Sequence, residues 1–232
     1  MHVLMLSSSR AHNSEYLAPN RDLIDRHLGD RKQLLFVPFA GISLSYDDYT
    51  AMVQQALPEY QVVGIHTFSD PIQAVKDAEA ILVGGGNTFH LLYQLQTQGL
   101  MAPIQEAVKT GTPYIGWSAG SNICGATIRT TNDMPIIEPP SFTALGFVPC
   151  QLNPHYTDEH PKDFHGETRD QRLMEFSVLH PEIPIVGIRE GSALILHEQN
   201  LRLAHIEDGV MFIHGEKSVL SAGADLTSLL YS

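Results

Sequence analysis

A turn of five residues, Gly116-Trp117-Ser118-Ala119-Gly120, constrains this chain more than any other stretch. It follows an apolar run and precedes small and polar residues that can open a helix. The G-x-S-x-G spacing is typical of a nucleophile elbow, in which a serine on a sharp strand-to-helix turn is exposed above a sheet. Glycine is needed there because the backbone is strained and other segments come close. Alone, the pattern also fits an ordinary strand-to-helix loop.

The first half of the chain alternates short apolar runs with helical patterns. We predict strands at residues 3–6, 34–39, 62–66, 80–83 and 114–117, and helices near 16–28, 46–57, 72–76, 89–96 and 102–109. Such an alternation indicates an α/β fold with a parallel sheet covered on both faces. Ligands of such folds bind beyond the carboxyl ends of the strands, so the loops that follow strands are the ones to inspect.

The last third of the chain reads differently. After a helix near 170–179, short strands at 185–188, 193–196, 201–204 and 210–213 are joined by tight turns. This pattern predicts antiparallel hairpins that complete one edge of the fold. The length fits one large domain or two small ones, and we expect a single catalytic domain over residues 1–232.

Composition narrows the function classes. The net charge is −12 without a basic cluster, so a nucleic-acid partner is not expected, and an anionic substrate needs a local arginine. Apolar runs are too short to span a bilayer, and the N-terminus lacks a signal-like stretch, so we expect a cytoplasmic protein without membrane contact. Cys124 and Cys150 are expected to be reduced and buried.

The glycine-rich loop at residues 84–88 follows a predicted strand and allows three interpretations. It lacks the spacing of known phosphate-binding loops. Its amides can instead form an oxyanion hole for a substrate carbonyl. The third possibility is a turn capped by Asn87 or Thr88. Its position one βα unit before the elbow favours the oxyanion hole.

A serine nucleophile needs a base, usually a histidine held by a carboxylate. His155 is the best candidate, because it lies in a polar loop directly after a proline, whereas His160 and His165 are weaker. These histidines, with Asp158 and Asp163, could instead bind zinc, but their spacing matches neither of the common zinc patterns.

Glu190 is the preferred candidate for the carboxylate that holds the histidine. It sits just past a predicted strand, at the carboxyl edge of the sheet. Spacing alone favours it only modestly over Glu198, Glu207 or Asp208.

Taken together, these motifs resemble peptidase E, the aspartyl dipeptidase family of serine peptidases. The resemblance runs nearly end to end, through PFAG (38–41), VGGGNTF (83–89), YIGWSAG (114–120), TIRTTNDMP (127–135), NPH (153–155), GETR (166–169) and EG (190–191). Residues 121–125 depart from the family pattern, which affects the packing of the elbow helix and not the proposed site.

The resemblance implies a Ser-His-Glu triad of Ser118, His155 and Glu190, with the backbone amides of Gly86 and Ala119 as oxyanion donors. It implies a three-layer α/β/α fold similar to class I glutamine amidotransferases. It also implies hydrolysis of dipeptides with an N-terminal aspartate, without a metal or another cofactor. The expected partner is a small peptide substrate, and the protein is expected to be a monomer or a homodimer.

Recognition of aspartate requires a cation for the side-chain carboxylate and an acceptor for the free ammonium. Arg169 is the first candidate for the cation, since arginine binds carboxylates in a bidentate fork, and Arg129 is the alternative. Asp133 and Glu167 are candidates for the ammonium.

Other functions remain open at this stage. Relatives that degrade cyanophycin act on aspartyl conjugates, and a general esterase or an amidase would use the same elbow. A metabolite-binding domain would use the glycine loop without chemistry at Ser118.

Overall fold

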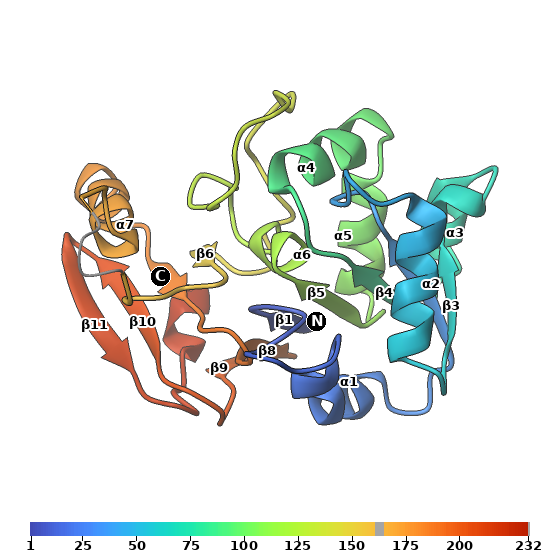
Figure 1. Ribbon diagram of the computed structural model, residues 1–232, viewed down its shortest axis with the longest axis horizontal. Coiled ribbons are helices and arrows are strands. Elements are labelled where there is room, and N and C mark those ends of the chain that lie inside the picture. Colours follow the sequence, from blue (N-terminus) through green and yellow to red (C-terminus); the bar gives the residue numbers. More distant parts are fainter. Residues whose placement is uncertain (161–164, 232) are drawn as a thin grey trace.

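The computed structural model describes residues 1–160 and 165–231, and its centre is a seven-stranded sheet (Figure 1). The strand order is β3 (Gln61–Gly64), β2 (Gln33–Val37), β4 (Ala80–Val83), β5 (Tyr114–Trp117), β1 (His2–Leu6), β8 (Ala193–His197) and β9 (Asn200–Leu203). The first five run parallel, and β8 and β9 are antiparallel additions at one edge. The predicted, mainly parallel sheet is confirmed.

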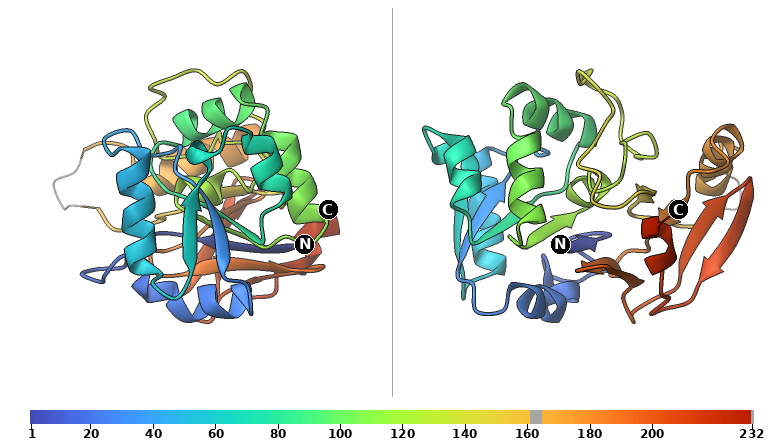
Figure 2. Two further views of the ribbon diagram at one scale, coloured as in Figure 1. Left: turned by 90° about the vertical axis from the view of Figure 1, so that its right-hand side faces the viewer. Right: turned by 180° about the vertical axis from the view of Figure 1, so that it is seen from behind.

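Helices cover both faces of this sheet (Figure 2). One face packs against α1 (Arg21–Leu28) and α2 (Tyr46–Ala56), and the other packs against α3 (Pro71–Lys76), α4 (Thr88–Thr97) and α5 (Met101–Lys109). Alternate strand residues enter the two cores: Leu4 lies in the first, and its neighbour Met5 lies in the second. Burial on both faces explains why the strands are continuous apolar runs.

Local signals set most helix boundaries. The Ser45 hydroxyl accepts the Asp48 N–H at 3.0 Å and starts α2, and Asn87 accepts the His90 N–H at 3.0 Å and starts α4. The first predicted helix begins late, at Arg21 instead of residue 16, because Leu17 has a φ of 60°, which a helix does not allow. In the described part of the chain, three short 3-10 segments occur at Ala18–Asn20, Ile65–Thr67 and Thr227–Tyr231.

The antiparallel hairpins predicted for the C-terminal third are confirmed, but they belong to two different sheets instead of completing one edge. A second sheet has the order β11 (Glu216–Leu220), β10 (Gly209–Ile213), β7 (Ile185–Gly187) and β6 (Gln151–Asn153). Only β8 and β9 extend the central sheet, while β6 and β7 pair in parallel. Helix α7 (Arg169–Leu179) packs on this second sheet through Leu173, which joins a separate core with Ile185 and Phe212. Local patterns show that strands exist, but burial decides which strands pair.

Cys124 and Cys150 are free and fully buried, as the sequence predicts. Burial raises the pKa of the Cys150 thiol to about 12, so this thiol stays protonated at neutral pH and is a poor nucleophile. Within residues 1–160 and 165–231, no helix combines the length and the apolar character that crossing a membrane requires.

The elbow glycines generate a stability prediction. A Cβ at Gly120 would lie 2.2 Å from the Val83 carbonyl oxygen, so Gly120→Ala should lower the free energy of unfolding by about 3 kcal/mol. At Gly99 a Cβ meets nothing within 4 Å, and Gly99→Ala should cost only about 1–2 kcal/mol from its positive φ. Urea unfolding measures both, and equal losses would contradict the crowding at Gly120.

Candidate active site

Ser118 occupies a strained turn between β5 and α6 (Ala119–Asn122). Its φ of 53° and ψ of −112° are unusual for a residue with a side chain. A Cβ at Gly116 would lie 2.3 Å from the Gly120 carbonyl oxygen, so both glycines of the motif are needed for the chain to turn this sharply. The local geometry is that of the elbow that the G-x-S-x-G spacing predicts.

His155 lies against the serine, two residues beyond β6. Its Nε2 is 2.9 Å from the Ser118 Oγ, and its Nδ1 is 2.6 Å from the Glu190 Oε1. Glu190 follows β7, which pairs in parallel with β6. The parallel pairing brings the two loops to the same end of the second sheet. Three side chains distant in the sequence therefore form one continuous relay of hydrogen-bonding groups.

The relay is held by the backbone more than by burial, since 38% of the His155 side chain and 52% of the Glu190 side chain are exposed. The buried Ser7 hydroxyl accepts the His155 N–H at 2.8 Å and donates to the Ile188 carbonyl at 2.7 Å. Ser8 accepts the Gly191 N–H at 3.2 Å. The loop after β1 thus ties the two segments that carry the base and the acid.

The glycine-rich loop lies directly beside Ser118. A Cβ at Gly85 would lie 2.9 Å from the Ser118 Cβ, and Gly86 has a φ of 137°. Within the described residues, the Gly86 N–H has no hydrogen-bond acceptor. Ala119 is the first residue of α6, so its N–H has no acceptor within that helix. Both amides are therefore available to a ligand at the serine.

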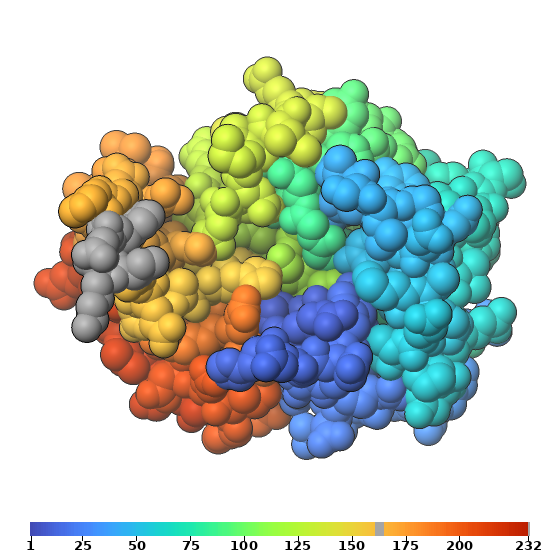
Figure 3. Space-filling view, viewed as in Figure 1, coloured from blue at the N-terminus to red at the C-terminus, as the bar shows by residue number. Residues whose placement is uncertain are grey.

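A cavity of about 210 Å³ opens beside Ser118. The space-filling view shows the surface hollowed where the dark blue, green and yellow segments meet (Figure 3). The cavity is lined by Thr88, Ser118, Ala119, Asn122, Thr131, Asn132, Asp133, Pro154, His155 and Arg169. The polar stretch around residue 132 contributes one wall of this cavity.

Arg169 is the cation of this cavity. It is half-buried at the start of α7, where Nη1 donates to the Asn153 Oδ1 at 3.4 Å. No carboxylate in the described part of the chain forms an ion pair with it. Burial, and then the nearby charge of Arg172, lower the pKa of Arg169, which means that its positive charge is incompletely solvated. A bound anion would relieve that cost.

Asp133 is the acid of the cavity, and it also has a structural role. Its Oδ2 accepts the Thr88 N–H at 2.7 Å and the Thr131 hydroxyl at 3.2 Å. Thr88 is the first residue of α4, so the carboxylate satisfies a free amide at a helix N-terminus.

The other two specificity candidates lie outside the cavity. Arg129 is exposed because its neighbours Ile128 and Thr130 point into the protein, at 0% and 4% exposure. Glu167 lies 3.7 Å from Arg172 and lines a depression on the outer face of α7. The sequence could not separate these residues from Arg169 and Asp133, since the direction of a side chain from a loop depends on packing.

Sequence reasoning overlooked Asn122. It lies four residues after the nucleophile, which places both on one side of the elbow turn. It is 2% exposed and its Nδ2 donates to the Leu152 carbonyl at 2.7 Å. Its Oδ1 is buried without a hydrogen-bond partner among the described residues. The side chain thus offers the cavity an unused acceptor.

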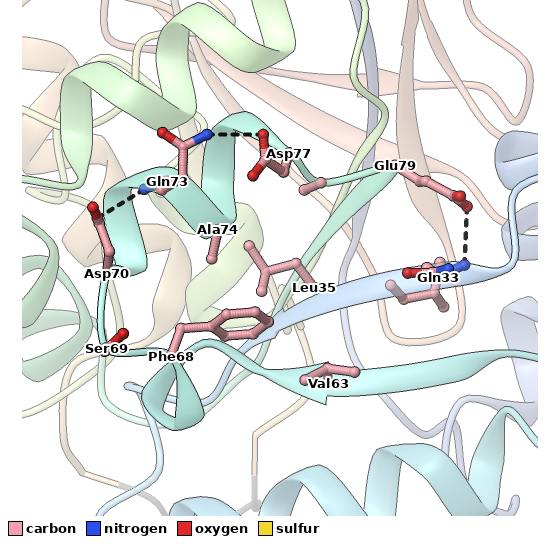
Figure 4. A pocket seen from close by; sticks show the side chains of 12 residues that line it. Gln33, Leu35, Val63, Phe68, Ser69, Asp70, Gln73, Ala74, Asp77 and Glu79 are labelled. Atoms are coloured by element: carbon pink, nitrogen blue, oxygen red, sulfur yellow. Dashed lines mark hydrogen bonds between the residues drawn. The ribbon is translucent and has the colours of Figure 1, made fainter.

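A second cavity, of about 320 Å³, lies between α3 and strands β2 and β3 (Figure 4). Its acids are already engaged: Asp70 caps α3 through the Gln73 N–H, Asp77 accepts from the Gln73 side chain, and Glu79 accepts the Gln33 N–H. No histidine is among its lining residues in the described part of the chain, so the usual base of a serine nucleophile is missing there, and the chemistry points to the cavity at Ser118.

The zinc alternative finds no geometric support. Asp158 forms a bidentate pair with Arg189 at 2.8 and 2.9 Å, which lowers the pKa of its carboxyl to about 2. Among residues 1–160 and 165–231, no cluster of three or more candidate ligands could hold a metal. Asp163 lies outside the described residues.

The chain is similar to known proteins along nearly its whole length. The family model described as "Peptidase family S51" matches residues 3–204. The chain is 50% identical over 231 residues to Peptidase E of Shewanella amazonensis, covering 98% of each, and 49% identical over 234 residues to that of Shewanella denitrificans, covering 99% of each.

Two solved structures share the fold. A protein of Listeria monocytogenes EGD-e, provisionally assigned as peptidase E, has a TM-score of 0.67 at 23% identity, covering 87% of this chain and 96% of its own. A peptidase from an acI-B1 Actinobacterium has a TM-score of 0.70 at 17% identity, covering 97% and 96%. The match of the family model and the identity to the Shewanella proteins lead to one conclusion: this chain belongs to peptidase family S51.

Proposed function

We propose that this peptidase hydrolyses dipeptides with an N-terminal aspartate. In this proposal Ser118 is the nucleophile, His155 is the general base, and Glu190 is the carboxylate that holds His155. The observation that carries the proposal is the relay from the Ser118 Oγ through both ring nitrogens of His155 to the Glu190 Oε1, with separations of 2.9 and 2.6 Å. Both contacts lie within hydrogen-bond reach, the geometry that activates a serine.

In the acylation step, His155 takes the hydroxyl proton as the Ser118 Oγ attacks the peptide carbonyl carbon. Glu190 holds the imidazole in the required tautomer and stabilises the imidazolium. The amides of Gly86 and Ala119 receive the negative charge on the carbonyl oxygen. His155 then protonates the leaving amine, and water hydrolyses the acyl-enzyme by the same route in reverse.

Arg169 supports the preference for aspartate. It is the cavity's half-buried cation without an ionic partner among the described residues, in a chain of net charge −12. A short carboxylate held by a fixed guanidinium would place the scissile bond at Ser118, whereas glutamate would push it past the nucleophile. Asp133, on the cavity wall, is the candidate for the free ammonium.

Replacing the nucleophile tests the chemistry directly. Ser118→Ala should lower kcat for an Asp-X dipeptide by roughly 10⁴-fold or more, because no other group attacks the carbonyl. Ser177→Ala is the matched control, since Ser177 is a buried hydroxyl that accepts the Gly215 N–H far from the cavity. Near-normal turnover by Ser118→Ala would refute the mechanism.

Replacing the acid tests the relay. Glu190→Gln keeps the shape of the side chain but cannot stabilise the imidazolium, so kcat should fall by roughly 10²–10⁴-fold with little change in KM. Glu198→Gln changes a carboxylate in the turn between β8 and β9 and should leave both constants unchanged. Equal behaviour of the two variants would remove Glu190 from the triad.

Replacing the arginine tests the substrate class. Arg169→Met should lower kcat/KM for Asp-X by roughly 10- to 10²-fold and abolish its advantage over Asn-X, because the side-chain carboxylate loses its cation. Arg129→Met, at an exposed arginine, should leave the preference unchanged. A kinetic panel of Asp-X, Glu-X, Asn-X and N-blocked Asp-X measures both. A retained preference in Arg169→Met would place the aspartate site elsewhere.

A further inference from the structure

Three aromatic side chains behind the serine form a chain of hydrogen bonds that ends on the glycine-rich loop. The Trp117 Nε1–H donates to the Tyr16 hydroxyl at 3.0 Å and also approaches the Tyr49 hydroxyl at 3.3 Å. The Tyr16 hydroxyl donates to that of Tyr49 at 3.2 Å. The Tyr49 hydroxyl donates to the Gly85 carbonyl at 2.9 Å. The direction is fixed by its two ends, because an indole N–H only donates and a carbonyl only accepts.

Trp117 and Tyr49 of this hydrogen-bond chain are buried, Tyr16 is partly buried, and both phenols stay protonated. Tyr49 is 5% exposed and Trp117 is 1% exposed. Burial raises the pKa of both Tyr16 and Tyr49 above the ordinary value of a phenol. The Phe36 ring stacks on that of Trp117 with ring centroids 5.7 Å apart, and it meets the Tyr49 ring edge-on with centroids 5.0 Å apart. This packing holds the rings in place. The Tyr49 hydroxyl is therefore a fixed donor at neutral pH.

The Gly85 carbonyl shares a peptide plane with the Gly86 N–H. In a trans peptide these two groups point in opposite directions, so a hydrogen bond that fixes the carbonyl also fixes the N–H. Donation to the carbonyl oxygen further polarises the amide and strengthens its N–H as a donor. The far end of the aromatic chain therefore acts on the amide proposed to bind the oxyanion.

The glycine run is shaped for this arrangement. A Cβ at Gly84 would lie 2.6 Å from the Tyr49 hydroxyl oxygen, and a Cβ at Gly85 would lie 2.9 Å from the Ser118 Cβ. The loop is thus held between the phenol on one side and the nucleophile on the other. Neither contact would tolerate a side chain without movement of the loop.

We propose that Tyr49 is a positioning residue that aims the Gly86 N–H at the oxyanion through the Gly85–Gly86 peptide, with Tyr16 as its supporting donor. This inference rests on the serine chemistry proposed above. It assigns α2, which contributes no residue to the cavity wall, a part in stabilising the transition state.

The test is Tyr49→Phe in the full chain, measured by the rate at which a fluorophosphonate probe modifies Ser118. The probe forms an Oγ–P bond, expels fluoride and develops negative charge on its phosphoryl oxygen, so it reports on the oxyanion donors without any peptide. Removal of one oxyanion donor outright slows catalysis by roughly 10²–10³-fold. A less well oriented Gly86 N–H should therefore slow labelling by roughly 10-fold. It should lower kcat for Asp-X by a similar factor and change KM by less than about twofold.

Tyr60→Phe is the matched control. Tyr60 is also a buried phenol, 7% exposed, and its hydroxyl donates to Asp25 at 2.7 Å, in a cluster away from the serine. It should change stability without changing the labelling rate. If Tyr49→Phe labels as fast as Tyr60→Phe, the inference is overturned. Should Tyr49→Phe fail to fold, Tyr16→Phe decides, and labelling at the rate of Tyr60→Phe overturns the inference.

The outcomes separate this inference from the proposed function. If the wild-type protein is labelled but does not cleave Asp-X, the proposed substrate class is wrong. The comparison of the labelling rates of Tyr49→Phe and Tyr60→Phe still tests the role of Tyr49. Wild-type protein that is not labelled at Ser118 refutes both.

Discussion

The site depends on one buried hydroxyl that joins two sheets. Ser7 directly follows β1 of the central sheet, and its Oγ bonds the backbone of His155 and of Ile188, both of which follow strands of the second sheet. These two hydrogen bonds fix the distance between the sheets at the point where Ser118 meets His155. A hydroxyl can do this because it donates and accepts at once, and its burial removes water as a competitor.

The strain at the site follows from that constraint. Six described residues other than glycine have a positive φ, and Ser118 and His155 are two of them. Such conformations cost of order 1–3 kcal/mol each and persist only where the surroundings over-determine them. Here the elbow glycines allow the neighbouring backbone to pack closely around Ser118. The hydrogen bond from the His155 N–H to the Ser7 hydroxyl fixes the backbone of His155. Stability elsewhere in the two cores therefore supports the alignment of the proposed relay.

Charge distinguishes the cavity from the rest of the protein. The chain is acidic throughout, so its general field repels an anionic ligand, and a half-buried arginine without an ion-pair partner in the described residues is the local exception. The amide network around Arg169, in which Asn153 accepts from it and donates to Asn132, fixes the guanidinium without neutralising it. An uncompensated, oriented cation suits a small carboxylate better than a flexible surface lysine would.

Several features could be predicted from local patterns. The parallel strands are continuous apolar runs, the elbow is a five-residue motif, and His155 follows a proline in a polar loop. The longer motifs also indicated the family. The pairing of β6 with β7 could not be predicted, because three-residue strands carry too little periodicity to choose a partner. Nor could Arg129 be separated from Arg169, because both are arginines in polar segments and only the burial of their neighbours sets their direction.

The sequence by itself determined the layered fold, the strained serine and the chemical types available to assist it, since these follow from hydrophobic period, glycine spacing and side-chain chemistry. The tertiary structure alone decided which groups meet. It brought a phenol from α2 onto the back of the glycine-rich loop, and a hydroxyl from the loop after β1 between two distant loops. Such long-range contacts depend on the packing of whole layers and leave no trace in the spacing of neighbouring residues.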